Sequence, residues 1–201
     1  MTSPRLIPAL LALALLAACA PRTAPVAQMP MAQAPQWKPG DYWVFNTKTR
    51  SPFTMAERME VAQVGDEIVL TGNGDPTRKV RLDKDFCVKE SQGTLLRYSV
   101  ASGQDAYIFF PLAVGESRTF QQSTALAKGT QNYVNTVMVE AAEEITVSAG
   151  TFKTFRIRVS KRNETGWSGT YMMWYAPDVG YFVRVVDTQN NIAELVKYGK
   201  K

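Results

Sequence analysis

The chain contains no histidine and only two cysteines, Cys19 and Cys87, among its 201 residues. The absence of histidine excludes Ser-His and Cys-His nucleophile pairs and histidine-containing zinc sites. It also removes the side chain whose ordinary pKa lies closest to neutrality. The sequence has no metal-ligand spacing and no glycine-rich phosphate loop. We therefore expect a protein that is not an enzyme and that needs no metal ion or cofactor.

The apolar run near the start of the chain is too short to be a membrane-spanning helix. It covers thirteen residues, 6–18, whereas a helix needs roughly 20 to cross a bilayer. Arg5 precedes the run and small residues end it, which is the layout of a secretory signal. The ending Leu16-Ala17-Ala18-Cys19 resembles the lipobox of bacterial lipoproteins. The resemblance implies a signal peptide over residues 1–18 that is removed, and acyl chains on Cys19 that hold the protein to a membrane.

The residue after Cys19 bears on which membrane the anchor enters. In enteric-type sorting, an aspartate at this position favours retention in the inner membrane, and here the position is Ala20. The resemblance therefore implies the outer membrane, on its periplasmic face, with the inner membrane as the alternative. If Cys19 carries lipid, Cys87 has no partner for an intrachain disulfide. A buried inert thiol and a reactive thiol both remain open for Cys87.

Four prolines interrupt the stretch that follows, residues 19–36. Because proline prevents a helix and favours an extended chain, we expect a tether here. At about 3.1 Å per residue, the tether could hold the domain as much as roughly 50 Å from the bilayer. The folded domain is expected over residues 37–201.

Length and charge limit the partners of the chain. Removal of residues 1–18 leaves 183 residues, and the loss of Arg5 lowers the formal charge from +5 to +4. This length suits one domain with its own core. The mild positive charge is compatible with an anionic membrane surface or glycan nearby. It lacks the dense basic stripe of nucleic-acid-binding proteins, so we expect no nucleic-acid partner.

Short β-rich runs separated by turn residues recur along the domain. Gly65-Asp66 lies between two apolar runs and predicts a hairpin, and residues 155–159 alternate apolar with polar side chains, as a half-buried strand does. Helical periodicity is nearly absent. We predict an all-β fold, either a single antiparallel barrel, a half-barrel or a sandwich, of about a dozen short strands. The predicted strands include 42–45, 80–82, 86–88, 95–100, 107–110, 133–139, 143–147, 155–159, 171–176, 181–186 and 192–198.

Three segments of the second half resemble a known group of proteins. They are Phe110–Glu116, Ile145–Phe155 and Trp174–Arg184. The V-x-AGTF turn of the second segment and the W-Y-A-P-x-V-G motif of the third resemble the DUF3108-like exported β-domains of the Gram-negative envelope, whose function is unassigned. The resemblance covers roughly residues 105–190. It implies a β-domain and an envelope location, and it carries over no catalytic residues.

Two sets of side chains are candidates for binding. Aromatic residues, together with eight methionines, could line a cavity for an apolar ligand, although aromatic residues are also common in ordinary β cores. The aromatic residues that we single out are Trp43, Trp167, Tyr171, Trp174 and Tyr175. The second set, Arg156, Arg158 and Arg162, shares one strand face. It could contact phosphate or carboxylate groups of lipid or glycan, or it could be a solvated outer face.

These observations leave three hypotheses. The first is a membrane-anchored periplasmic lipoprotein with a non-enzymatic β interaction module for an envelope protein or the cell wall. It requires a filled interior. The second is a carrier of lipid or another apolar ligand, which requires a continuous cavity lined by aromatic residues. The third is a carboxylate-based hydrolase of the envelope, which requires two carboxyl groups that face each other in a cleft.

Overall fold

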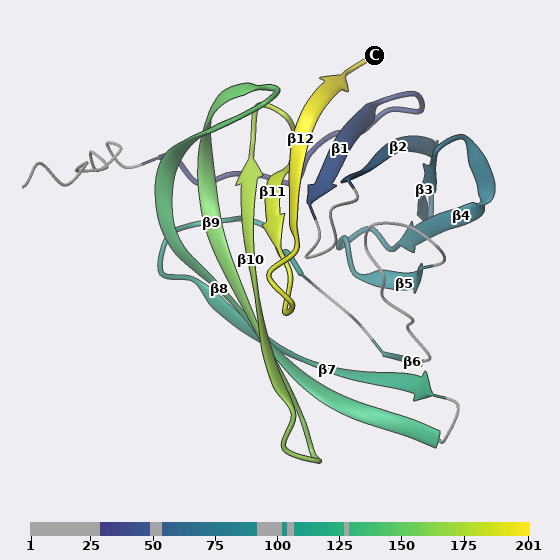
Figure 1. Cartoon of the computed structure of the whole chain (residues 1–201), viewed down its shortest axis with the longest axis vertical. Coiled ribbons are helices and arrows are strands. Elements are labelled where there is room, and N and C mark those ends of the chain that lie inside the picture. The colour runs from purple at the N-terminus through teal and green to yellow at the C-terminus, as the bar shows by residue number, and fades with distance from the viewer. Residues whose placement is uncertain (1–28, 49–53, 92–101, 104–106, 127–128) are drawn as a thin grey trace, which may run out of the picture.

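The computed structural model describes residues 29–48, 54–91, 102–103, 107–126 and 129–201. The predicted signal peptide, Cys19 and the predicted strand over 95–100 lie outside these residues. Within them the chain forms twelve strands in one antiparallel sheet (Figure 1). The strands are β1 (Tyr42–Lys48), β2 (Thr54–Val64), β3 (Ile68–Gly72), β4 (Asp75–Leu82), β5 (Val88–Ser91), β6 (Ser102–Gly103), β7 (Ser117–Leu126), β8 (Gly129–Val147), β9 (Gly150–Asn163), β10 (Ser168–Ala176), β11 (Tyr181–Val186) and β12 (Ile192–Gly199).

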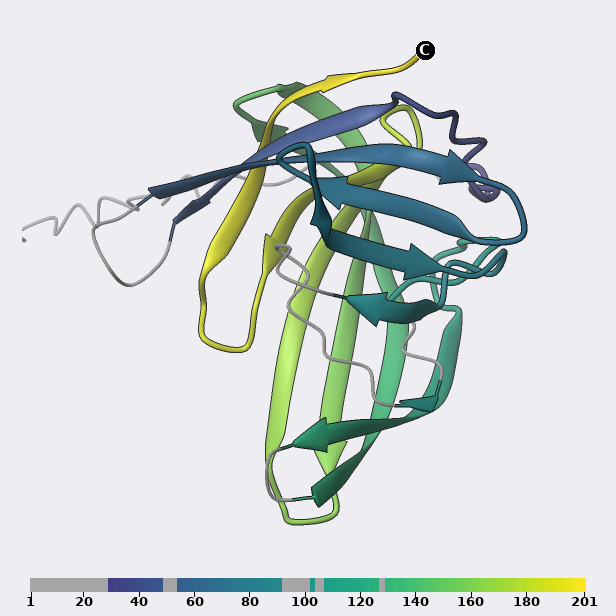
Figure 2. The same cartoon turned by 90° about the vertical axis from the view of Figure 1, so that its right-hand side faces the viewer.

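The sheet is a meander whose first and last strands meet in its middle. Its strand order is β5-β4-β3-β2-β1-β12-β11-β10-β9-β8-β7-β6, and β1 pairs with β12 over its whole length. The sheet curls strongly, and its ends, β5 and β6, are not paired with each other in the described residues (Figures 1 and 2). The predicted all-β antiparallel fold is confirmed, and the sheet is an open half-barrel, not a closed barrel. No helix in the described ranges is long and apolar enough to span a membrane.

The longest hairpin, β8–β9, contains the turn that the sequence predicts at Ala149-Gly150. Gly150 has a φ of +137°, a backbone conformation that side chains disfavour. Instead of two predicted strands, residues 129–147 form the single strand β8, with a shift of register between Val139 and Ala141. This irregularity accommodates one extra residue and bends the strand.

Two predicted strands take other forms. Residues 107–109 are buried and Phe110 is partly buried, but the segment makes no ladder and instead passes across the inside of the half-barrel. Phe86 has a φ of +62° and follows a turn, so β5 begins only at Val88. Both segments contribute aromatic side chains to the core. Strong apolar character predicts burial at these places, but it does not distinguish a strand from an irregular buried segment.

The part of the predicted tether that is described lies against the domain. We call residues 29–37 the strap. Ala32 is buried and exchanges two backbone hydrogen bonds, of 2.9 and 2.8 Å, with Leu112. At the end of the strap, Trp37 donates its indole N–H to the carbonyl oxygen of Gly180 at 2.9 Å. Contacts with the domain therefore begin before Trp37, where the sequence places the start of the domain. In Figure 1 the strap runs from the left of the view toward β1 on the right.

The core lies on the inner face of the half-barrel. Alternate side chains of the strands point into it, as the period of two requires. The strap and residues 107–112 fill the space between the two walls of the sheet. The largest side chains that are almost completely buried are Trp43, Phe155, Met59, Leu70, Leu112, Ile157, Met173 and Leu195.

Candidate functional site

A cluster of aromatic rings around Tyr181 closes the inner face between β1 and β11. The ring of Trp43 stacks on Tyr181 with centroids 4.5 Å apart, and Trp37 of the strap lies 5.8 Å from Tyr181. Phe45 lies 5.9 Å from the same ring. The indole N–H of Trp43 donates to the carbonyl oxygen of Val179 at 3.4 Å. The polar atoms of both indoles therefore have partners, as buried tryptophans require.

One small apolar cavity remains beside this cluster. Its volume is about 40 Å³, enough for about three water molecules and far below the roughly 300–1,000 Å³ of typical ligand pockets. The space beside the Tyr181 cluster is therefore largely filled by side chains, whereas a larger pocket of about 430 Å³ lies between the strap, the β4–β5 turn and residues 108–120. The small apolar cavity is lined by Pro35, Trp37, Leu70, Leu82, Phe86, Val88, Tyr107, Ile108, Phe110, Tyr175, Tyr181 and Phe182.

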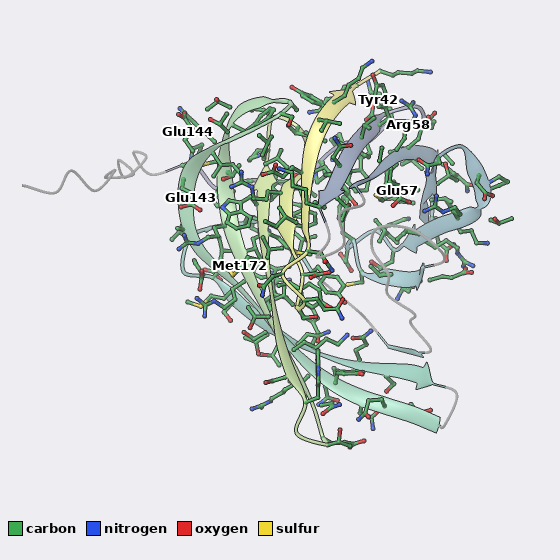
Figure 3. All side chains as sticks on the ribbon, in the orientation of Figure 1. Tyr42, Glu57, Arg58, Glu143, Glu144 and Met172 are labelled. Carbon is green, nitrogen blue, oxygen red and sulfur yellow. The ribbon has the colours of Figure 1, made fainter. Side chains whose placement is uncertain are left out.

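The polar groups near this core are held in a dry environment. Burial raises the pKa of Tyr175 and Tyr181 well above the ordinary value, and the negative charge of Glu57 raises that of Tyr181 further. Glu57, labelled in Figure 3, is 4% exposed and forms an ion pair of 2.7 Å with Arg78. The hydroxyl of Tyr181 faces the sulfur of Met59 at 3.7 Å. Both tyrosines therefore remain neutral at physiological pH.

The five aromatic residues singled out for ligand binding are not brought together. Trp43 and Tyr175 are buried in the core, and of the five only Tyr175 lines the cavity. Tyr171 packs edge-to-face against Tyr107. Trp167 is 43% exposed in the turn between β9 and β10, and Trp174 lies on the outer face. In the described residues, these side chains do not form one continuous aromatic-lined cavity.

Two acidic residues of β8 form ion pairs with Arg156 and Arg158, the first two of the three arginines singled out on β9. Glu140 pairs with Arg156 at 3.2 Å and also contacts Arg158. Glu143 pairs with Arg156 at 3.3 Å and accepts the indole N–H of Trp174 at 2.6 Å. This network lies on the outer face of β8–β10, and Figure 3 shows Glu143 on the bent end of β8. The positive charge of Arg156 and Arg158 is therefore balanced locally.

Arg162 differs from the other two arginines. Among the described residues it is in no ion pair, and it is exposed. Two shallow grooves of about 370 and 380 Å³ flank it and share Arg162 and Val134 as lining residues. The remaining lining residues are mostly amides and hydroxyls. They are Gln121, Gln122, Ser123, Asn132, Tyr133, Asn163 and Glu164 in the first groove, and Thr136, Ser160, Lys161, Ser168, Gly169 and Thr170 in the second.

A buried polar cluster that sequence reasoning missed lies on the inner side of the same strands. Lys161 is 8% exposed, donates to the amide oxygen of Gln122, and lies 4.4 Å from the ring centroid of Tyr133. Asn135 is fully buried and donates to the same oxygen at 3.3 Å. The alternation of side chains along β9 could have indicated this position, because Lys161 has the parity of the buried Ile157.

Carboxylates lie close together in the sequence at two places, Asp83 with Asp85 and Glu143 with Glu144. Asp83 lies in a turn and accepts the backbone N–H groups of Asp85 and Cys87. Glu143 belongs to the outer ion-pair network, while its neighbour Glu144 is exposed (Figure 3). In the ranges that the structure describes, no group of three or more potential ligands could hold a metal ion.

Cys87 is buried at 5% exposure and is not in a disulfide. The lysines on either side of it are engaged by aspartates. Lys84 contacts Asp66 at 3.1 Å, and Lys89 contacts Asp83 at 3.0 Å. The surroundings of the thiol are those of a small side chain packed in the core.

The chain matches no protein-family model and no curated protein sequence. Among solved structures, it is similar to a candidate lipoprotein from Parabacteroides distasonis, with 11% identity and a TM-score of 0.46 over 85% of this chain and 100% of the other. It is also similar to the hypothetical lipoprotein YmcC from Escherichia coli, with 7% identity and a TM-score of 0.47 over 83% of this chain and 90% of the other. These likenesses do not decide the function, and the resemblance to DUF3108-like proteins stays a prediction.

Proposed function

We propose that the chain is a lipoprotein of the Gram-negative envelope, anchored through acyl chains on Cys19 at the periplasmic face of the outer membrane. Its β-domain is a non-enzymatic interaction module for an envelope protein or the cell wall. The lipobox-like ending of the apolar run supports the anchor, and Ala20 supports the outer membrane. The absence of histidine and the engagement of Asp83 and Glu143 by other groups support a non-enzymatic role.

The small volume of the apolar cavity in the core is the observation that most supports an interaction module. The apolar cavity beside the Tyr181 cluster, about 40 Å³, is too small for a lipid chain. A partner must then bind on the surface. The strap helps to fill this space because Pro35 and Trp37 line the cavity.

The far end of the β7–β10 wall is the surface that best suits a partner. It carries the two grooves around Arg162, and the exposed indole of Trp167 at the adjacent turn. Tryptophan and arginine are the residues that most often dominate binding energy at interfaces. In Figure 1 this end of the sheet extends below the rest of the domain, so a partner could approach it.

Site-specific photo-crosslinking in living cells tests this surface. Photoreactive residues are placed at Ser160 and Thr170, which line one groove, and at Lys197 on β12 as an exposed control. We expect a crosslinked product from the first two positions, not from Lys197, and its loss on Arg162→Glu. Equal products at all three positions would contradict a specific surface.

A carrier of apolar ligands is the second candidate, because every residue that lines the small cavity is apolar or aromatic. Native mass spectrometry of residues 29–201, purified from periplasm, separates the two functions. The interaction module predicts a mass without ligand. A stoichiometric apolar adduct would favour the carrier and would require the two walls of the half-barrel to separate around it.

A further inference from the structure

The edge of the domain at the end of the strap nearest Cys19, which we call the exit edge, carries two exposed apolar side chains. Met31, which is 54% exposed, precedes the buried Ala32. Val114 is 52% exposed and lies two residues after Leu112, at the tip of the turn that enters β7. Because Ala32 and Leu112 are paired, Met31 and Val114 belong to the same edge of the molecule. They are two of the five large apolar residues that are substantially exposed in the described part of the chain.

We infer that this exit edge rests on the lipid surface that receives the anchor. The inference depends on the proposed acylation of Cys19. Only ten peptide units separate Cys19 from Met29, and a fully extended chain gains at most about 3.6 Å per residue, so they span no more than about 36 Å. The exit edge, where the chain from Cys19 joins the domain, therefore lies within about 36 Å of the anchor.

The chemistry of the exit edge indicates which lipid it contacts. An apolar side chain gains free energy when it leaves water for the interface between headgroups and acyl chains. Glu116 and Arg118 are both exposed, two and four residues after Val114, so opposite charges lie side by side near this edge and neither sign of lipid charge is favoured. The edge therefore suits a zwitterionic surface such as phosphatidylethanolamine. Arg156 and Arg158 on the outer face are already paired with Glu140.

Environment-sensitive probes test the contact in the full-length lipidated protein. Single cysteines are introduced by Met31→Cys and Val114→Cys in a Cys87→Ala background, labelled with a nitrobenzoxadiazole dye, and reconstituted into phosphatidylethanolamine vesicles. Val64→Cys is the matched control, since Val64 is 44% exposed at the β2–β3 hairpin, which lies on the right in Figure 1, away from the strap exit. Intact-mass measurement of each sample reports acylation of Cys19.

We expect spin-labelled lipid to quench the dye at positions 31 and 114 about twofold or more, and to leave position 64 almost unchanged. Addition of anionic lipid should not strengthen the quenching. Equal quenching at all three positions, or none at 31 and 114 in acylated protein, overturns the exit-edge contact and leaves the proposed function standing. A mass without acyl chains on Cys19 overturns both.

Discussion

Ala32 and Leu112, which are far apart in the sequence, are joined by a pair of backbone hydrogen bonds of 2.9 and 2.8 Å. Because of this bridge, the strap at the end of the proline-containing stretch 19–36 is part of the domain. The stretch that could separate the domain from its anchor is therefore shorter than residues 19–36. With the proposed anchor on Cys19, the distance that the chain could span between anchor and domain falls from roughly 50 Å to no more than about 36 Å.

Trp37 should contribute to stability as a core residue although it lies in the strap. Its ring packs on Trp43, Phe86 and Tyr181, and its N–H is bonded to Gly180. We expect Trp37→Ala to lower the free energy of unfolding by about 2–4 kcal/mol. Trp37→Phe should lower it by about 1 kcal/mol, since it loses the hydrogen bond and keeps most of the packing.

Urea denaturation of residues 20–201, followed by circular dichroism, measures these changes. Trp167→Ala is the matched control, because Trp167 is 43% exposed, and it should cost less than about 1 kcal/mol. If Trp37→Ala cost no more than Trp167→Ala, the strap would not be part of the cooperative domain.

Stability should fall in alkaline solution because of Tyr175 and Tyr181. Burial keeps the pKa of both phenols above the ordinary value in the folded state, so only the unfolded chain releases these protons near pH 10. The unfolded state then binds fewer protons than the folded state, and the free energy of unfolding decreases as pH rises. Each tyrosine should account for about 1 kcal/mol between pH 10 and pH 11.

Urea titrations at several pH values from 8 to 11 measure this decrease. Tyr181→Phe should make it smaller, since it removes one of the two titrating groups. A decrease that is the same in Tyr181→Phe and in the original protein would argue that other groups cause it.

Gly150→Ala should destabilise the β8–β9 hairpin. Its φ of +137° is unfavourable for any residue with a Cβ, and the substitution should cost about 1–2 kcal/mol. Gly65→Ala, in the β2–β3 turn, is the control, because a Cβ there meets no atom closer than 4.0 Å and the residue has no positive φ. Thermal unfolding of both variants measures the effect, and similar melting temperatures would contradict it.

Glu140 should control how strongly the outer face attracts polyanions. Glu140→Gln leaves Arg156 and Arg158 without their shared carboxylate, so we expect later elution from a heparin column. Glu116→Gln changes the net charge equally, but Glu116 is in no ion pair among the described residues, and it should shift elution less. Because the pairs are partly exposed, the free energy of unfolding should change by less than about 1 kcal/mol. Equal shifts for the two variants would show that net charge alone determines retention.

The sequence predicts the sheet better than it predicts what fills the sheet. Alternation at Phe155, Ile157 and Val159 and the glycine turn at Gly150 are local signals, and the structure confirms both. The strap and residues 107–112 carry no such signal, because their place depends on pairing with distant parts of the chain. The candidate aromatic residues show the same limit. Five aromatic residues suggest a cavity, but the alternation of side chains along each strand places Trp174 on the outer face and Trp43 in the core.

The pairing of β1 with β12 places a constraint on biosynthesis. The seam between the two halves of the sheet forms only when the last residues, Ile192–Gly199, reach Tyr42–Lys48. During synthesis, one edge of β1 therefore stays unpaired until the end of the chain has emerged. Such long-range pairing slows folding and exposes strand edges to other chains. A nascent chain that stalls before residue 192 therefore exposes the unpaired edge of β1 to chaperones and proteases.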